Sequence, residues 1–274
     1  MRCTAGVDIG STYTKAAVLD GDRELVATAM VPTGFRLERA ARAALDRALA
    51  EAELPSDDVA YLITTGYGRN RVSFRDLQAT ALTAQAWGTR WFFPETRTVL
   101  DVGGQTMKAM RLDDAGMVRS FRLNDKCAAG TGAFLEKTAR YLGYRIEEIG
   151  PLVEASSEEV PISGVCAVFA ESEVINHVSN GKAPEDIMHG AMRSLIEKSV
   201  RLMKRVQMEP EFTLVGGIMR FPTMLRLLRD ELGERVNVPP ESRVQYTGAI
   251  GAAVLAARRL ERTGGPERSA AATA

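Results

Sequence analysis

Two stretches of this chain, residues 5–31 and residues 98–123, repeat one order of local structure. Each reads as an apolar strand with an aspartate, a glycine turn, a returning strand with a lysine, an acidic glycine turn and a third strand. The aspartates are Asp8 and Asp101. Such a repeat is much more specific than either turn alone. It predicts an α/β protein with two duplicated domains, whose hairpins face one cleft.

The rest of the chain alternates predicted helices with short buried strands. Periodicity predicts helices over 37–54, 80–93, 167–179, 184–208 and 222–232, and strands over 59–65, 212–215 and 236–238. A helix rich in small residues begins at Thr247 and is suited to close packing on another helix. We expect domains at 1–95 and 96–262, and the Gly/Ala/Ser bias of 263–274 predicts a disordered tail.

The turn of the first repeat has the composition of a phosphate-binding hairpin. Gly10 allows close approach of the backbone, and Lys15 adds positive charge. Ser11 and Thr12 offer hydroxyl and amide donors to phosphate oxygens. Asp8, at the strand end, is placed to hold Mg²⁺ or its water. For this motif alone, an ordinary β-hairpin with a glycine turn is an equally good interpretation.

A glycine pair, Gly216 and Gly217, directly follows the predicted strand over 212–215. Glycines in this position suit the close approach of a flat adenosine group. A plain strand–helix turn explains the pair equally well when it is taken alone.

Two of the three cysteines, Cys127 and Cys166, each precede a helical pattern. A thiol near a helix N-terminus is favoured as a thiolate, although a buried apolar cysteine is the plainer alternative. Neither belongs to a Cys-x-x-Cys pair, so a zinc site within one chain is disfavoured. Two ligands per chain cannot close a four-cysteine iron–sulfur site, but two chains can. The pattern favours a metal cluster on a dimer axis, with Cys3 as a structural residue.

The composition excludes some classes of partner. Lys+Arg 35 balance Asp+Glu 35, which argues against general affinity for nucleic acid. No stretch approaches the ~20 apolar residues of a membrane span. A few unpaired cysteines fit a reducing compartment. We therefore expect a cytoplasmic protein with no nucleic-acid or membrane partner.

Together the motifs resemble the actin/Hsp70/sugar-kinase ATPase superfamily. Residues 8–15 resemble its first phosphate motif, 100–108 its second and 215–219 its adenosine motif. Within it, the segments around Cys127 and Cys166 resemble the BadF/BadG/BcrA/BcrD-type ATPases. These are the activators of 2-hydroxyacyl-CoA dehydratases and the ATPase subunits of benzoyl-CoA reductases. The resemblance spans roughly the whole chain before the tail.

The resemblance implies duplicated ribonuclease-H-like domains with a nucleotide cleft between them. It also implies one [4Fe–4S] cluster shared by two subunits through Cys127 and Cys166 of each. The residues it assigns to catalysis are Asp8, Asp101 and Gln105. Those it assigns to ATP, ADP and Mg²⁺ are Gly10, Ser11, Thr12, Tyr13, Thr14, Lys15, Gly103, Gly104, Lys108, Gly216, Gly217 and Gln245. The implied partners are a second ATPase subunit, reduced ferredoxin or flavodoxin as electron donor, and a downstream acyl-CoA reductase or dehydratase.

One departure bears on the choice of partner. Thr106 stands where activators often carry an aspartate, so the role of that carboxylate cannot be copied. Together with residues 139–143, this favours an ATP-hydrolysing electron-transfer subunit of a benzoyl-CoA reductase. The alternatives are a homodimeric dehydratase activator, a small-molecule kinase of the same superfamily, and a non-enzymatic iron–sulfur redox sensor.

Overall fold

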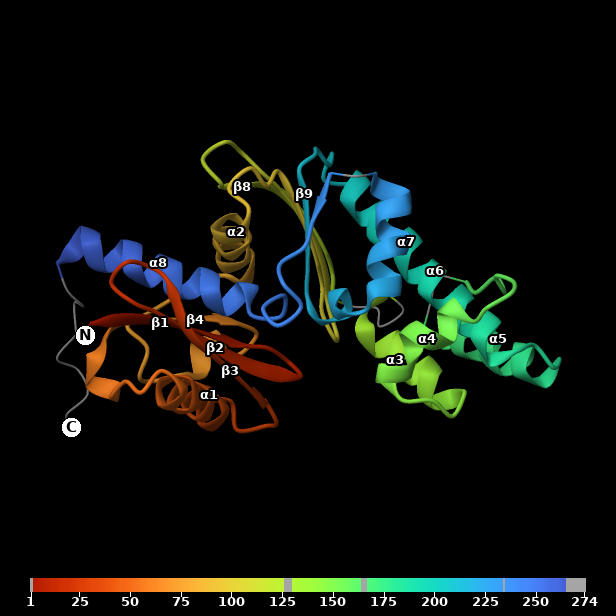
Figure 1. The fold of residues 1–274 in the computed structure, drawn as a ribbon, viewed down its shortest axis with the longest axis horizontal. Helices are drawn as coiled ribbons and strands as arrows, with labels where there is room; N and C mark the ends of the chain where they lie inside the picture. Colours follow the sequence, from red (N-terminus) through yellow and green to blue (C-terminus); the bar gives the residue numbers. More distant parts are fainter. Residues whose placement is uncertain (1, 126–129, 164–166, 234, 265–274) are drawn as a thin grey trace. The chain divides into compact units, whose positions relative to one another are not determined.

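The computed structural model describes residues 2–125, 130–163, 167–233 and 235–264. The chain divides into two compact units (Figure 1). Unit 1 comprises Met1–Pro94 together with Gln245–Ala274, and unit 2 comprises Glu95–Val244. The predicted tail from residue 265 onward lies outside the described residues. No helix in the described ranges is both long and apolar enough to cross a membrane.

Unit 1 is built on a five-stranded sheet, here called sheet A, with strand order β3-β2-β1-β4-β5. Its strands are β1 (Cys3–Ile9), β2 (Tyr13–Leu19), β3 (Leu25–Pro32), β4 (Val59–Gly66) and β5 (Leu77–Gln78). Its helices are α1 (Leu37–Glu51), α2 (Ala81–Phe92) and α8 (Thr247–Thr263), with 3₁₀ turns η1 (Ser56–Asp58) and η2 (Arg69–Arg71). The first three strands are antiparallel, whereas β1, β4 and β5 run parallel.

Sheet A lies between two helical layers, with α1 on one face and α2 and α8 on the other (Figure 1). Val7 and Ile9 pack with the buried alanine and leucine face of α1. Ile63, one strand away, points to the other face, where it packs with Ala84 of α2 and Ala252 of α8. Because successive side chains along each strand point to opposite faces, both faces of the sheet are packed against helices and buried.

Helix α8 belongs to unit 1, although the sequence analysis grouped residues up to 262 with the second half. The predicted close packing of α8 on another helix is confirmed, and that helix is α2. A β-carbon at Gly251 would lie 1.7 Å from Ala84 O, and one at Gly88 would lie 1.9 Å from Thr247 O. The two backbones approach too closely for any side chain at these points. Helix α8 is therefore packed directly on α2, which comes much earlier in the sequence.

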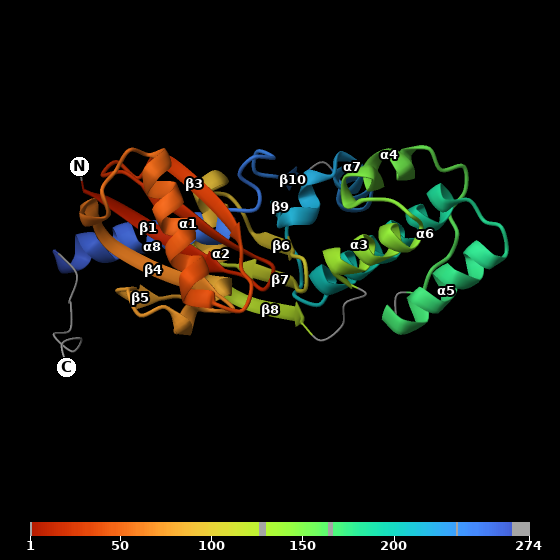
Figure 2. The same cartoon turned by 90° about the horizontal axis from the view of Figure 1, so that it is seen from below.

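Unit 2 repeats the architecture in sheet B, whose strand order is β10-β9-β6-β7-β8. Its strands are β6 (Thr98–Val102), β7 (Met107–Leu112), β8 (Val118–Asn124), β9 (Phe212–Val215) and β10 (Val236–Asn237). Its helices are α3 (Gly132–Tyr141), α4 (Ile149–Glu154), α5 (Ala167–Ser179), α6 (Pro184–Lys204) and α7 (Pro222–Leu232), with η4 (Ile146–Glu148) and η5 (Gly217–Arg220). Figure 2 shows these helices gathered on one side of the strands, where they enclose the larger core. The matching strand orders confirm the duplicated α/β fold.

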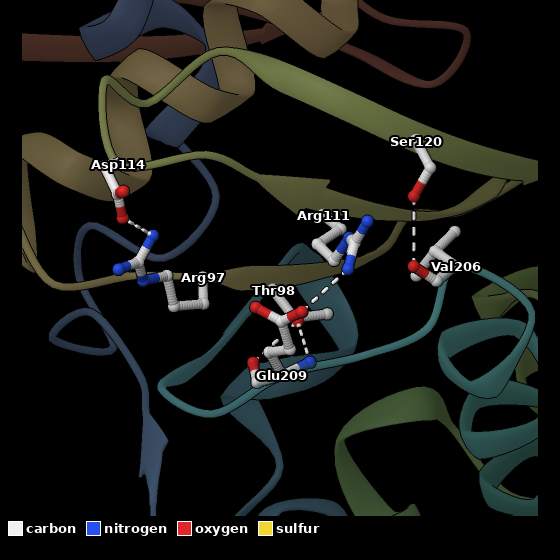
Figure 3. A network of polar contacts seen from close by, with 7 residues as sticks. All are labelled: Arg97, Thr98, Arg111, Asp114, Ser120, Val206 and Glu209. Carbon is white, nitrogen blue, oxygen red and sulfur yellow. Dashed lines mark hydrogen bonds and ion pairs between the residues drawn. The ribbon is translucent and has the colours of Figure 1, made fainter.

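A polar network fixes the end of sheet B at which β6 begins (Figure 3). Thr98 Oγ1 donates to Glu209 O at 2.7 Å and accepts from Glu209 N at 2.8 Å. The Glu209 carboxylate pairs with Arg111 at 2.7 Å, and Arg97 pairs with Asp114. Ser120 Oγ donates to Val206 O at 3.0 Å. These contacts tie the segment between α6 and β9 to three neighbouring strands.

Candidate functional site

The first predicted phosphate hairpin joins β1 to β2. Asp8 and Lys15 are direct partners across the two strands, with Lys15 Nζ 3.7 Å from Asp8 Oδ2. The turn closes through Gly10 N, which donates to Tyr13 O at 3.2 Å. Ser11 and Thr12 are exposed at its tip. The structure therefore brings the predicted charged pair together below an exposed turn.

Thr33, which the sequence analysis did not select, braces this hairpin. Its N–H donates to Thr12 O at 3.0 Å, and its hydroxyl donates to Gly10 O at 2.8 Å. Thr14 is fully buried, and its hydroxyl lies 2.9 Å from the Thr33 hydroxyl. Thr14, which was predicted to bind nucleotide, therefore stabilises the conformation of the turn through this buried contact.

The second hairpin repeats this arrangement between β6 and β7. Asp101 and Lys108 are direct partners, with Lys108 Nζ 2.7 Å from Asp101 Oδ2. Gly103 N donates to Thr106 O at 2.8 Å, which closes the turn. Gly104 and Gln105 are exposed at the tip. Gln105, one of the residues predicted to act in catalysis, therefore lies on the accessible side of the turn.

Each aspartate also lies against a glycine at the end of the neighbouring parallel strand. Gly66 ends β4 with φ +86°, and Gly216 follows β9 with φ +99°. A β-carbon would lie 2.3 Å from Asp8 Oδ1 at Gly66 and 2.8 Å from Asp101 Oδ1 at Gly216. Only glycine both adopts this backbone conformation readily and leaves room for the neighbouring aspartate oxygen. Gly216, predicted as an adenosine contact, thus borders the Asp101 carboxylate, and Gly66 is its unpredicted counterpart beside Asp8.

Gln85 of α2 and Gly248 of α8 complete the surroundings of Asp8. A β-carbon at Gly248 would lie 3.1 Å from both Asp8 Oδ2 and Gln85 Oε1. Gln85 is buried, so both oxygens lie against Gly248 in the interior of unit 1. The sequence analysis did not select Gln85; a polar residue on an otherwise apolar helix face is the signal that could have identified it.

The two remaining nucleotide candidates, Gly217 and Gln245, belong to different units. Gly217 begins η5, and Gly216 N donates to Val244 O at 3.3 Å. Gln245 is the first residue of the second segment of unit 1 and is half-buried.

The turn of the second hairpin is bonded directly to helix α3. Gly132 N donates to Gly103 O at 3.0 Å, and Ala133 N donates to Gly104 O at 2.8 Å. The first N–H groups of a helix have no partner within it, so here the phosphate turn supplies their acceptors. Any change in the turn therefore acts on the start of α3.

Cys127 and Cys166, the predicted cluster ligands, lie outside the described residues. In the sequence, Cys127 comes shortly before α3, which begins at Gly132, and Cys166 directly precedes α5, which begins at Ala167. Lys137 of α3 and Glu171 of α5 form an ion pair at 2.6 Å, which joins the two helices. Within the described ranges no three His, Cys, Asp or Glu residues form a metal-binding group.

Cys3 has the surroundings expected of a structural thiol. It is buried in the core beneath α1, and its Sγ lies 3.5 Å from Asp58 O. Burial, with the nearby Asp58 charge, raises the pKa of the Cys3 thiol. A protonated, enclosed thiol is unsuited to metal binding.

A polar cavity of about 550 Å³ lies at the opposite end of sheet B from the Asp101 hairpin. Three arginines line it, and each pairs with a carboxylate: Arg97 with Asp114, Arg111 with Glu209 and Arg119 with Asp113. Because these charges balance, the cavity offers no excess positive charge to a phosphate. It contains none of the predicted nucleotide residues.

The model of the BadF/BadG/BcrA/BcrD ATPase family matches residues 5–256. The chain belongs to this family. The activator of lactoyl-CoA dehydratase from Anaerotignum propionicum is 39% identical over 253 residues, which are 92% of this chain and 96% of the relative. A benzoyl-CoA reductase subunit from Thauera aromatica is 34% identical over 275 residues, covering 96% of this chain and 95% of the relative.

A solved structure agrees with membership of the BadF/BadG/BcrA/BcrD ATPase family. The activator of the 2-hydroxyisocaproyl-CoA dehydratase from Clostridium difficile, with bound ADPNP, matches with a TM-score of 0.88 and 36% identity. The match covers 96% of this chain and 97% of that chain. The resemblance and the fold class predicted from the motifs are confirmed. The comparisons do not specifically favour the benzoyl-CoA reductase type, since a dehydratase activator shows the higher identity.

Proposed function

We propose that this chain hydrolyses ATP to drive single-electron transfer to a partner acyl-CoA enzyme. The observation that carries this proposal is the bonding of Gly132 and Ala133, at the start of α3, to the Gly103–Gly104 turn. This turn is the second phosphate motif, and Cys127 lies shortly before α3 in the sequence. One helix start thus links the nucleotide residues to a cluster ligand.

Asp8 and Asp101 are the residues proposed to hold Mg²⁺ with the nucleotide phosphates. Each stands at a strand end with a lysine beside it, at 3.7 Å and 2.7 Å respectively. Mg²⁺ is commonly bound by one or two carboxylates together with phosphate oxygens and waters. A site with few carboxylates therefore fits this ion, while Lys15 and Lys108 suit the phosphates.

The proposed cluster ligands are Cys127 and Cys166 from each of two chains. Their donor set fits a [4Fe–4S] cluster, which takes four thiolates and supplies single-electron chemistry when bound. The Lys137–Glu171 pair joins the helices after the two cysteines, which supports their acting as one body. A shift in α3 is then passed to α5.

We propose a 2-hydroxyacyl-CoA dehydratase as the partner, with reduced ferredoxin or flavodoxin as the electron donor. The 39% identity to a lactoyl-CoA dehydratase activator supports this choice. A benzoyl-CoA reductase is the second candidate, supported by Thr106 and by the 34% identity to the Thauera aromatica protein.

Anaerobic purification with iron and sulfide analysis tests the proposal. We expect one [4Fe–4S] cluster per dimer, lost in Cys127→Ala and in Cys166→Ala but kept in the control Cys3→Ala. Mg-ATP should be hydrolysed, and electrons should reach a dehydratase with a 2-hydroxyacyl-CoA rather than a reductase with benzoyl-CoA. A colourless, iron-free protein that phosphorylates a small molecule would contradict electron transfer. A full cluster on a demonstrated monomer would contradict the shared ligand set.

A further inference from the structure

Thr65, the penultimate residue of β4, carries a buried hydroxyl that the fold does not use. Its side chain is 1% exposed. Its Oγ1 has no hydrogen-bond partner among the residues that the structure describes. Leaving a buried hydroxyl unbonded costs free energy, so such groups in native proteins are normally paired with protein or with ordered water. A ligand or water at Thr65 is therefore expected.

The position of Thr65 places this hydroxyl beside the first aspartate. Thr65 and Asp8 are direct partners on the parallel strands β4 and β1, so their side chains project from the same face. This is the face of sheet A covered by α2 and α8, where Ile63 packs two residues earlier. Asp8 is also the partner of Lys15 on β2. Thr65, Asp8 and Lys15 therefore form one row across three strands.

The duplicated half of the molecule supplies a natural comparison. In sheet B the partner of Asp101 on the neighbouring parallel strand is Val215, which is fully buried. Valine has almost the shape of threonine but lacks the hydroxyl. The architecture itself therefore accepts valine at this place, and the hydroxyl at Thr65 is not a requirement of the fold.

The adjacent residue Thr64 shows what a structural threonine does in the same strand. Its side chain is fully buried and points to the opposite face. Its hydroxyl donates to Arg69 O at 3.0 Å, which fastens β4 to η2. Thr64 and Thr65 thus share residue type, burial and strand, and differ in whether the hydroxyl is used internally.

We propose that the Thr65 hydroxyl positions water in the hydration shell of the magnesium ion that binds with nucleotide, next to Asp8. Mg²⁺ dehydrates reluctantly and keeps several waters in protein sites. A hydroxyl both donates and accepts, so it is suited to hold a metal-bound water on the side of the site where Asp8 lies. Unit 1 carries this hydroxyl beside Asp8, whereas the corresponding residue beside Asp101 in unit 2 is Val215. This inference rests on the proposed binding of Mg-nucleotide.

Thr65→Val, Thr65→Ser and Thr64→Val test the inference. Mn²⁺ replaces Mg²⁺ as the probe, and its binding in the presence of ADP is measured by the loss of the free-ion EPR signal. Unfolding by urea is measured on the same samples. Thr65→Val should weaken Mn²⁺ binding about threefold to tenfold without loss of stability, which is the size expected for one hydrogen bond. Thr65→Ser should restore the affinity. Thr64→Val should lose stability and keep wild-type Mn²⁺ affinity.

Two results would overturn the inference. In one, Thr65→Val binds Mn²⁺ as the wild type does, which removes the hydroxyl from the cation site while the proposed function stands. In the other, Thr65→Val is destabilised as much as Thr64→Val with unchanged Mn²⁺ affinity, which makes the hydroxyl structural. A wild-type protein that binds neither Mn²⁺–ADP nor Mg-ATP would instead contradict the proposed function as well.

Discussion

Lys108 Nζ lies 2.7 Å from Oδ2 of Asp101, directly across the ladder between β6 and β7. The two side chains are only 18% and 12% exposed. Removing one charge of such a pair leaves the other poorly solvated, so each residue depends on its partner.

Asp101→Asn should therefore lose most Mg-ATP hydrolysis. The variant keeps the shape of the side chain but leaves Lys108 facing a neutral amide, and it removes a proposed metal ligand. We expect hydrolysis to fall roughly 10²-fold or more, measured as phosphate release at saturating Mg-ATP. Asp114→Asn is the control, because that carboxylate also pairs with a cation, Arg97, but is 88% exposed and lies in the turn after β7. Wild-type turnover in Asp101→Asn would refute the assignment.

Gly216→Ala should be more damaging than Gly233→Ala. Both glycines adopt a conformation that side chains avoid, with φ 99° and ψ 166° at Gly216 and φ 82° and ψ −173° at Gly233. A β-carbon at Gly233 meets no described atom within 4 Å, whereas at Gly216 it would lie 2.3 Å from Val102 O. Gly233→Ala should lower the free energy of unfolding by about 1–3 kcal/mol through backbone strain alone.

Gly216→Ala should lose more than this, and it should also slow hydrolysis because Asp101 Oδ1 is displaced. Urea unfolding and phosphate release of both variants provide the measurement. Equal losses of stability with unchanged hydrolysis would mean that the contact between Gly216 and Asp101 imposes no constraint.

Asp186 in the first turn of α6 should make unit 2 sensitive to acid. The Glu158 N–H, with that of Ser157, donates to its carboxylate at 3.0 Å and 2.8 Å. These bonds hold the pKa of Asp186 below its ordinary value of 3.8. The stabilisation is thus fully present above pH 3.8 and is lost as the pH falls through the lower pKa of the folded state.

Asp186→Asn should consequently show a flatter fall in the free energy of unfolding between about pH 5 and pH 2 than the wild type. Urea titrations at each pH measure it. Asp230→Asn, which removes one exposed carboxylate from α7, is the control for charge. If both variants keep the wild-type dependence of the unfolding free energy on pH, the hydrogen bonds from residues 157 and 158 do not contribute to the acid sensitivity.

Gly132→Val should separate hydrolysis from its effect on the proposed cluster. A β-carbon at Gly132 would lie 3.4 Å from Gly103 O, so the larger side chain presses on the phosphate turn. We expect ATP to bind while the nucleotide-dependent change in iron removal by a chelator disappears. Gly150→Val is the control, since a β-carbon there would meet one atom, Thr223 Oγ1, at 3.6 Å. Chelation rates identical with no nucleotide, ADP and ATP in the wild type would refute the coupling.

Local sequence patterns predicted much of this fold, because strand alternation and glycine turns are properties of short segments. The hairpins that carry Asp8 and Asp101 lie where the repeat placed them. The sequence did not indicate β5, whose two residues are both exposed, or α4, which is one short helix containing Pro151. Neither is long enough to show a period.

The unpredicted parts of the site depend on contacts between distant segments. The role of Gly66 appears only when β4 lies beside β1, and that of Gln85 only when α2 meets α8. The small residues of α8 predicted close helix packing but not the partner helix. The sequence accordingly identified the charged residues of each hairpin and missed the groups that enclose them.

Helix α8 packs on sheet A, yet it is translated after the whole of unit 2. A β-carbon at Gly6 would lie 2.0 Å from Ala249 O, so β1 and α8 are in backbone contact across the whole length of the sequence. Unit 2 is continuous and has all its strands and helices before α8 is translated. The face of sheet A on which α8 packs therefore gains this helix only after the whole of unit 2 has been translated. For this protein the usual N-terminal-first order of domain completion is reversed, and the synthesis of α8 is the step that completes the surroundings of Asp8.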